Sequence, residues 1–195
     1  MRAISLWQPF ASAIAWGDKQ IETRSWGTRY EGLLLICATA KTPLDDFEAA
    51  TCNRHVVEVL LRENIIDTSH GFGRIEPEPV VALKRLPQAC AVAVAYLYAC
   101  DMIEAAHATD DGGTFLRARA LFEHPTEYTI SPMEAAFGFY DSGRFAWKLR
   151  DVRPLPQPIP CKGAQGIWKV PAELEAQVRL ALALPTTPST KETLL

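Results

Sequence analysis

Four residues that can build a charged pocket follow one another closely near the start of the chain. The segment SLWQPFASAIAWGDKQIETRSW holds Gly17, Lys19, Glu22 and Arg24. A lysine that is desolvated beside an arginine loses its proton more easily, and a nearby carboxylate can hold either cation or move protons. The cluster therefore permits anion binding or acid–base chemistry. A solvated charged edge, whose ion pairs contribute little to stability, explains the spacing equally well.

The elements around this cluster decide whether its charged side chains converge. Residues 2–6 are typical of a short strand, PFASAIAWG has helical spacing and ends on Gly17, and QIETRSW alternates like a strand. On an ideal strand, Lys19 faces away from Glu22 and Arg24. Convergence therefore requires Lys19 to lie in the turn before the strand.

The rest of the chain predicts short strands with few helices. Strands are expected at 32–38, 89–100, 144–155 and 166–170, and helices at 45–64 and 171–184, with a further short helix at 114–122. The glycines and prolines of 65–87 indicate an irregular loop or an insertion. This pattern favours the α+β class, with a small β-barrel and flanking helices, over a layered α/β sheet.

Composition limits the classes of function. The chain has 195 residues, 48% of them apolar, and a formal charge of −3, which predicts one main domain and excludes a polycationic coat for nucleic acid. The five cysteines form no metal-ligand spacing, so we predict no metal and no cofactor. No long apolar run is present, which predicts a cytoplasmic protein without a membrane partner. The sequence does not predict the oligomeric state.

Aromatic side chains near the cluster are candidates for stacking on bases, at about 1–3 kcal/mol per stack. Trp7 and Trp26 flank the cluster, and Tyr30 and Tyr140 are further candidates. Trp147 lies inside an alternating strand, where core packing is the favoured role.

Polar candidates complete the predicted ligand-binding set. Ser142 and Arg144 lie in a predicted tight turn, where backbone amides and an arginine could meet a phosphate or carbonyl oxygen. Lys162 lies in a glycine-containing loop, and Gln8 follows Trp7 directly. Alternatively, Ser142 and Arg144 belong to a hairpin turn without a ligand, and Lys162 belongs to a surface loop without a ligand.

The segment SLWQPFASAIAWGDKQIETRSW resembles the signature of the ASCH family, in which a helix is followed by Gly-x-Lys-x-x-Glu-x-Arg. Residues 30–41 and 137–170 are similar to the larger bacterial and prophage-type members of that family. The resemblance covers most of the chain outside insertions at about 65–87 and 101–136. It implies a single domain over residues 1–184 with a PUA-like barrel, and composition predicts a flexible tail at 185–195.

The resemblance also implies that the Lys–Glu–Arg segment lines a cleft that associates with RNA or nucleotide substrates. The first hypothesis is a module that binds RNA or a modified nucleoside such as a modified cytidine. The alternative is an amidohydrolase for N4-acetylcytidine-type nucleosides, or an ASCH ribonuclease, with Lys19, Glu22 and Arg24 as catalytic residues. An accessory protein with a vestigial cleft is a third interpretation.

The amidohydrolase hypothesis meets a departure from the family's pattern. Some small ASCH proteins hydrolyse N4-acetylcytidine with a Lys/Thr/Glu site, in which the threonine lies three residues after the lysine. That position is Glu22 here, and Thr23 would point to the other side of a strand. The nucleophile is therefore not identified. A deep closed pocket would favour the enzyme, and an open basic groove would favour RNA.

Overall fold

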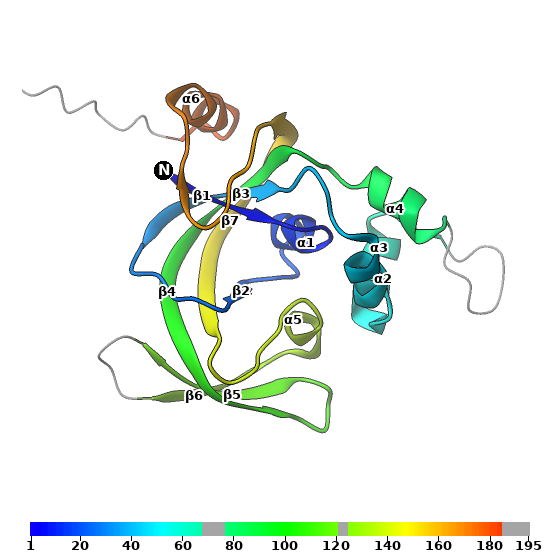
Figure 1. Cartoon of the computed structure of the whole chain (residues 1–195), viewed down its shortest axis with the longest axis vertical. Coiled ribbons are helices and arrows are strands. Elements are labelled where there is room, and N and C mark those ends of the chain that lie inside the picture. The colour runs from blue at the N-terminus through cyan, green and yellow to red at the C-terminus, as the bar shows by residue number, and fades with distance from the viewer. Residues whose placement is uncertain (68–76, 121–124, 185–195) are drawn as a thin grey trace, which may run out of the picture.

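The computed structural model describes residues 1–67, 77–120 and 125–184 of the chain. They form one eight-stranded sheet in the order β2-β7-β4-β3-β1-β8, with β5 paired to β4 and β6 paired to β5 (Figure 1). The strands are β1 (Arg2–Leu6), β2 (Ile21–Arg24), β3 (Gly32–Ala38), β4 (Cys90–Ala108), β5 (Thr114–Ala120), β6 (Thr126–Ile130), β7 (Phe145–Pro160) and β8 (Trp168–Lys169). The helices are α1 (Phe10–Trp16), α2 (Leu44–Thr51), α3 (Arg54–Arg62), α4 (Pro79–Arg85), α5 (Pro132–Ala136) and α6 (Ala172–Ala181). The predicted α+β class is confirmed.

Two long antiparallel strands, β4 and β7, form the centre of the sheet. Their pairing register shifts at three places, and such bulges bend a sheet and increase its twist. The sheet accordingly curls until β5 and β6 lie across one end of the molecule (Figure 1). The strand order runs from β2 to β8, and among the described residues these two edge strands do not pair with each other. The predicted small barrel is therefore corrected to a curled, open sheet.

Helix α1 lies inside the curve of the sheet (Figure 1). Its Ala11 and Ala13 are fully buried, and such small side chains let the helix approach its neighbours closely. Ile14 packs with Trp147 and the central strands in the main hydrophobic core. The helix ends at Gly17, whose φ of 90° is the left-handed conformation that glycine adopts without strain.

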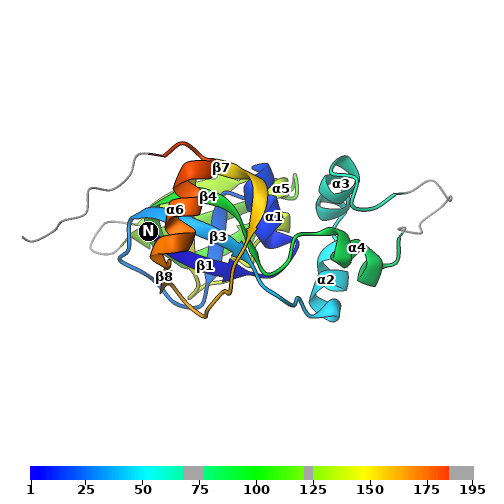
Figure 2. The same ribbon diagram turned by 90° about the horizontal axis from the view of Figure 1, so that it is seen from above.

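The helix predicted at 45–64 is two helices, α2 and α3. They separate at Asn53, whose side chain accepts a hydrogen bond from the backbone N–H of His55 and so caps α3. Residues 68–76 of the predicted loop lie outside the described residues, and 79–85 form α4. The three helices share a core around Phe47, Val59 and Leu83 and lie together at one end of the molecule (Figure 2).

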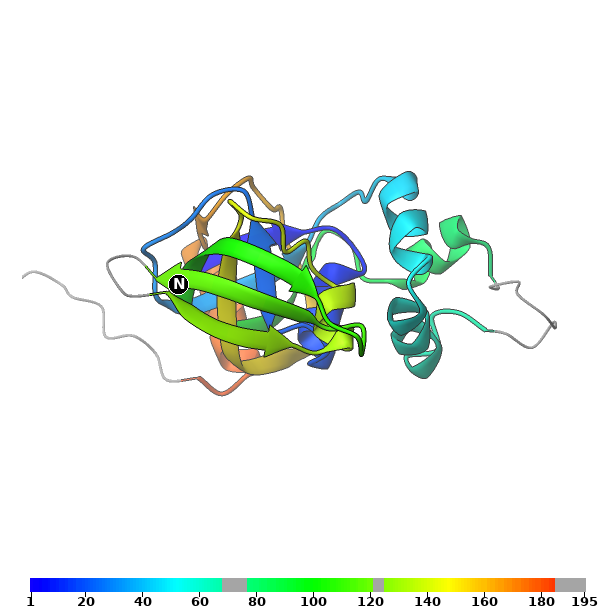
Figure 3. The same cartoon turned by 90° about the horizontal axis from the view of Figure 1, so that it is seen from below.

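The helix predicted at 114–122 is wrong, because residues 114–120 form β5 and residues 121–124 lie outside the described part of the chain. Leu116 and Ala118 are fully buried, and Arg117 between them is exposed, which is the two-residue period of a strand. β5 lies between β4 and β6 (Figure 3), and β4 extends to Ala108, beyond its predicted end.

The C-terminal segment covers the opposite end of the sheet. The strand predicted at 166–170 is the shorter β8, and the helix predicted at 171–184 is α6. Leu174 and Val178 of α6 pack on a core cluster with residues of β1, β3 and β4. The predicted tail at 185–195 lies outside the described residues. Within the described residues, no helix is long and apolar enough to cross a membrane.

Candidate functional site

Lys19 occupies the turn between α1 and β2, as convergence requires. The backbone N–H groups of Asp18 and Lys19 both donate to the carbonyl oxygen of Ala13, so the turn is held against the end of α1. The Lys19 side chain is 1% exposed. Its Nζ donates to the carbonyl oxygens of Ile21 (2.5 Å) and Phe137 (2.6 Å) and lies 3.4 Å from Glu22 Oε2. A buried ammonium is tolerated when it is paired in this way.

The carboxylate of Glu22 lies between two cations. Glu22 Oε1 is 3.0 Å from Arg24 Nε, and Glu22 Oε2 faces Lys19 Nζ. Glu22 pairs with the fully buried Trp147 of β7 in the strand register, which fixes its backbone. The structure therefore brings together Lys19, Glu22 and Arg24, the three predicted catalytic residues.

Two arginines near this carboxylate donate hydrogen bonds to backbone carbonyl oxygens. Arg24 Nη2 donates to the carbonyl oxygen of Ser5 (3.2 Å), and Arg144 Nη2 donates to the carbonyl oxygen of Thr23 (3.2 Å). The Arg144 guanidinium also lies over the ring of Phe139, 5.0 Å from its centroid. The Nε atoms of both arginines are buried without a hydrogen-bond partner among the described residues, although the Arg24 atom is within ion-pair distance of Glu22. Both arginines also line a cleft, where a guanidinium group is suited to an anionic or carbonyl oxygen.

A groove runs past these side chains in two adjoining parts. The inner cleft has a volume of about 560 Å³ and the outer cleft about 1150 Å³, and both are lined by Ser5, Trp7 and Arg24. The inner cleft is also lined by Leu6, Phe10, Glu22, Thr23, Asp46, Ala49, Ala50, Ala136, Phe137, Gly138, Phe139 and Arg144. The outer cleft is also lined by Trp26, Thr39, Ala40, Ala89, Pro160, Cys161, Lys162, Gly163, Ala164, Gln165 and Gly166. The two clefts therefore adjoin at these three residues, and together they are called the groove.

Three aromatic side chains stand exposed along the groove. Trp7 is 44% exposed, Trp26 is 36% exposed and Phe139 is 58% exposed. Trp26 also packs edge-on against Trp147, with ring centroids 4.7 Å apart and an interplanar angle of 85°. Trp147 has the core role favoured by its alternating strand. Exposed aromatic faces of this kind can stack on planar ligands.

Some predicted ligand-binding residues lie in the groove, and others bond to the main chain elsewhere. Trp7, Trp26, Arg144 and Lys162 line the two clefts. Gln8, Tyr30 and Ser142 are not among the described residues that line them.

Each of these three side chains has a partner within the fold. Gln8 is buried and donates to the carbonyl oxygen of Pro87 (2.7 Å), and Ser142 donates to that of Glu104 (2.8 Å). Tyr30 donates to the carbonyl oxygen of Leu33 (2.6 Å), and burial raises the pKa of its phenol. These contacts give each side chain a partner within the fold, and a role of the three residues in ligand binding stays a prediction.

Sequence reasoning missed Phe139 and chose its neighbour. Tyr140 is 6% exposed and donates its hydroxyl hydrogen to Glu134 Oε1 (2.8 Å). Burial and the Glu134 carboxylate raise the pKa of Tyr140. The exposed ring belongs to Phe139, whose backbone N–H donates to Thr23 Oγ1 (3.0 Å). The sequence FGFY at 137–140 does not indicate which of its three aromatic rings faces solvent.

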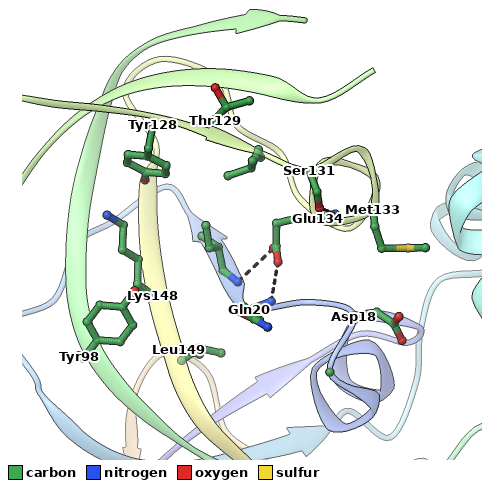
Figure 4. Close-up of a pocket in the computed structure, with 13 residues that line it drawn as sticks. Asp18, Gln20, Tyr98, Tyr128, Thr129, Ser131, Met133, Glu134, Lys148 and Leu149 are labelled. Carbon is green, nitrogen blue, oxygen red and sulfur yellow. Dashed lines mark hydrogen bonds between the residues drawn. The ribbon is translucent and has the colours of Figure 1, made fainter. Parts of the chain in front are cut away.

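Glu134 was also missed, although it positions the signature segment. Its carboxylate accepts hydrogen bonds from the backbone N–H groups of Gln20 (2.6 Å) and Ile21 (3.0 Å), as the dashed lines in Figure 4 show. The carboxylate borders a second cavity of about 480 Å³, which Gln20, Tyr98, Tyr128 and Lys148 also line. Ile21 of β2 lines this second cavity, whereas the next residue, Glu22, lines the inner cleft. Adjacent residues of β2 therefore line different cavities.

A comparison with curated proteins finds no match for this sequence. A model of the ASCH domain family matches residues 4–147, which include the Lys19 turn, β2, and the turn before β7. The matched stretch covers most of the chain and spans the inner cleft from Ser5 to Arg144. The chain therefore belongs to the ASCH domain family.

Proposed function

We propose that this ASCH-domain protein binds single-stranded RNA, or a modified nucleoside within it, along the groove of the inner and outer clefts. The observation that carries the proposal is the mixture of exposed aromatic rings and cations on one continuous surface. Phe139 and Arg144 lie in the inner cleft, Trp7 and Arg24 lie where the clefts meet, and Trp26 and Lys162 lie in the outer cleft. The same proposal includes the PUA-like architecture of the family, with which the curled sheet is consistent.

Stacking supplies the sequence-tolerant part of the binding energy. Bases of a single strand are free to splay out and stack on aromatic faces, and each stack contributes about 1–3 kcal/mol. The rings of Trp7, Trp26 and Phe139 are all at least partly exposed. A double helix keeps its bases paired and stacked, so it cannot use these rings in the same way.

Phosphate contacts supply the salt-dependent part. The groove holds the cations Arg24, Arg144 and Lys162 against the carboxylates of Glu22 and Asp46, and Glu22 is already paired with Lys19. A short basic stretch is compatible with the overall charge of −3. Three phosphate contacts to a single strand predict a slope of log K against log salt of about −2.

The environment of Lys19 favours binding over a lysine-centred hydrolase. A lysine that acts as a base or nucleophile needs a free electron pair near the substrate. Lys19 is buried, with its ammonium directed at two carbonyl oxygens and at Glu22. Its contacts support a role in holding Glu22 and the segment at Phe137 in position.

A second candidate function, hydrolysis of an acylated cytidine, rests on Glu22. Its carboxylate lines the inner cleft and could accept a proton from water, while Arg24 could stabilise the charge that develops on the acyl oxygen. Release of cytidine from N4-acetylcytidine by the parent, and not by Glu22→Gln, would support this candidate. Absence of release under conditions where RNA binds would discard it.

Fluorescence anisotropy with a labelled single-stranded RNA tests the binding proposal. We expect the parent protein to bind the single strand at low salt and to bind a duplex of the same sequence more weakly. Trp7→Ala should weaken binding by about 5- to 150-fold, which corresponds to the loss of one stack. Tyr98→Ala is the matched control, since Tyr98 is 40% exposed but lies outside both clefts. Equal affinity of the parent and Trp7→Ala would reject the groove as the site.

A further inference from the structure

Two cysteine sulfurs touch in the wall of the outer cleft. Cys161 follows β7 and lines the cleft, and Cys37 lies fully buried in β3. Their Sγ atoms are 3.7 Å apart. β4 pairs with both β3 and β7, so Cys37 of β3 and Cys161, directly after β7, approach each other from either side of β4. All five cysteines of the chain are reduced in this structure.

The two thiols differ in accessibility and in acidity. Cys161 is partly exposed, whereas Cys37 is completely covered. The hydrogen-bonded contact between the two thiols lowers the pKa of the Cys161 thiol, against the effect of burial, and a hydrogen bond from the Ala91 backbone lowers it further. The same contact and burial raise the pKa of Cys37. The accessible sulfur is therefore the one that ionises, and the thiolate is the reactive form.

We propose that Cys37 and Cys161 form an oxidation site, at which hydrogen peroxide converts the two thiols to a disulfide that reshapes the outer cleft. The pair lies outside the Lys–Glu–Arg cluster, and the effect of its oxidation on RNA rests on the proposed function. The formation of the disulfide does not depend on that function.

The oxidation balances in two steps. The Cys161 thiolate attacks one peroxide oxygen, the O–O bond breaks, and the departing hydroxide takes up a proton to leave as water, which gives a sulfenic acid on Cys161. The sulfur of Cys37 then attacks the Cys161 sulfur, the S–O bond breaks, and hydroxide leaves with the Cys37 proton as a second water. The two thiols lose two electrons in total, and one peroxide is reduced to two molecules of water.

Closure of the disulfide must move the cleft wall. A disulfide holds its sulfurs about 2.05 Å apart, so the Cys37 and Cys161 sulfurs must approach each other. Cys37 is held in β3, which pairs with β1 on one side and β4 on the other, whereas Cys161 begins the loop at 161–166. A Cβ atom at Gly163 would collide with Ser5 Oγ, so this loop already packs tightly on β1. We expect the loop to move and the outer cleft to change with it.

Intact-mass spectrometry after peroxide treatment tests the oxidation site. The parent should lose two hydrogen atoms, and a non-reducing peptide map should join the peptides that contain Cys37 and Cys161. Cys161→Ser should not form this link. Cys52→Ser is the matched control, since Cys52 is exposed at the end of α2 and should leave the link intact. Sulfinic or sulfonic acid on Cys161 without the link, in the parent, would overturn the proposal.

Hydrogen–deuterium exchange tests the effect on the cleft. Exchange of the backbone amides at 161–166 should slow on oxidation and recover on reduction with a thiol reagent, while exchange in Cys161→Ser should not respond. The affinity for single-stranded RNA should fall severalfold in the oxidised parent. Unchanged exchange at 161–166 after complete disulfide formation would overturn the coupling. Because exchange is measured without RNA, a reduced protein that binds no RNA would count against the proposed function alone.

Discussion

The ammonium group of Lys19 donates a hydrogen bond to the carbonyl oxygen of Phe137, 118 residues further along the chain, at 2.6 Å. The same group donates to Ile21 and faces Glu22, so one buried cation joins the signature strand to the segment that carries Phe139. Residues of both segments line the inner cleft. Lys19 is buried and therefore acts on the groove indirectly, by holding two of its lining segments together.

Replacement of Lys19 by methionine should destabilise the fold. The change leaves Glu22 without one of its two cations and leaves two buried carbonyl oxygens without their donor. Removal of one partner of a buried charged pair costs about 3–5 kcal/mol. Urea unfolding of Lys19→Met measures this loss. Lys162→Met, in the exposed loop of the outer cleft, is the control and should change stability by less than about 0.5 kcal/mol. Similar losses in both variants would contradict a structural role for Lys19.

Replacement of Glu134 by glutamine should loosen the signature segment. The carboxylate accepts from two backbone N–H groups and from Tyr140, and a hydrogen bond to a charged group contributes about 1.5–3 kcal/mol. We expect Glu134→Gln to lower the free energy of unfolding by about that amount and to weaken RNA binding. Glu127→Gln, at an exposed position of β6, should do neither. A Glu134→Gln protein with parental stability and affinity would show that the segment is held by other contacts.

Replacement of Arg144 by alanine should change the salt dependence of RNA binding. Loss of one phosphate contact to a single strand reduces the slope of log K against log salt by about 0.7. Anisotropy titrations at several salt concentrations measure the slope. Arg150→Ala is a matched control, because Arg150 stacks on Tyr96 and Tyr98 and does not line either cleft. An unchanged slope in Arg144→Ala would place the phosphates elsewhere.

The Glu175 carboxylate should make the stability of the fold depend on pH in the acidic range. Burial raises the pKa of Glu175, but hydrogen bonds from the Met1 ammonium and from Arg179 outweigh it, so the folded-state pKa is lowered. This stabilisation is present above the unfolded pKa of about 4.3 and is lost as pH falls through the folded pKa. The melting temperature of the parent should therefore drop more than that of Glu175→Gln between about pH 6 and pH 3. Parallel pH profiles would contradict this contribution.

Local patterns predicted the neighbourhood of the candidate site well. The helical spacing before Gly17 and the strand alternation after Lys19 predicted α1 and β2, and the required turn at Lys19 exists because Gly17 adopts a positive φ. The continuous apolar run at 32–38 predicted β3 with the observed bounds. Each of these signals depends on side chains that are neighbours in sequence.

Contacts between distant segments explain what the sequence did not predict. Glu134 holds Gln20 across 114 residues, and no local pattern marks such a pairing. The stretch at 114–120, which was predicted to be helical, instead pairs its backbone with β4 on one side and β6 on the other. The open sheet likewise follows from pairing between strands, which periodicity alone does not determine.

Ultraviolet cross-linking of the protein to single-stranded RNA, followed by mass spectrometry of the linked peptides, tests the groove most directly. Binding in the groove predicts links to the peptides that contain Trp7, Trp26 and Phe139, and their loss when unlabelled single strand competes. Links confined to the helices α3 and α4 or to the strands β5 and β6, or no specific link at low salt, would contradict the groove as an RNA-binding site.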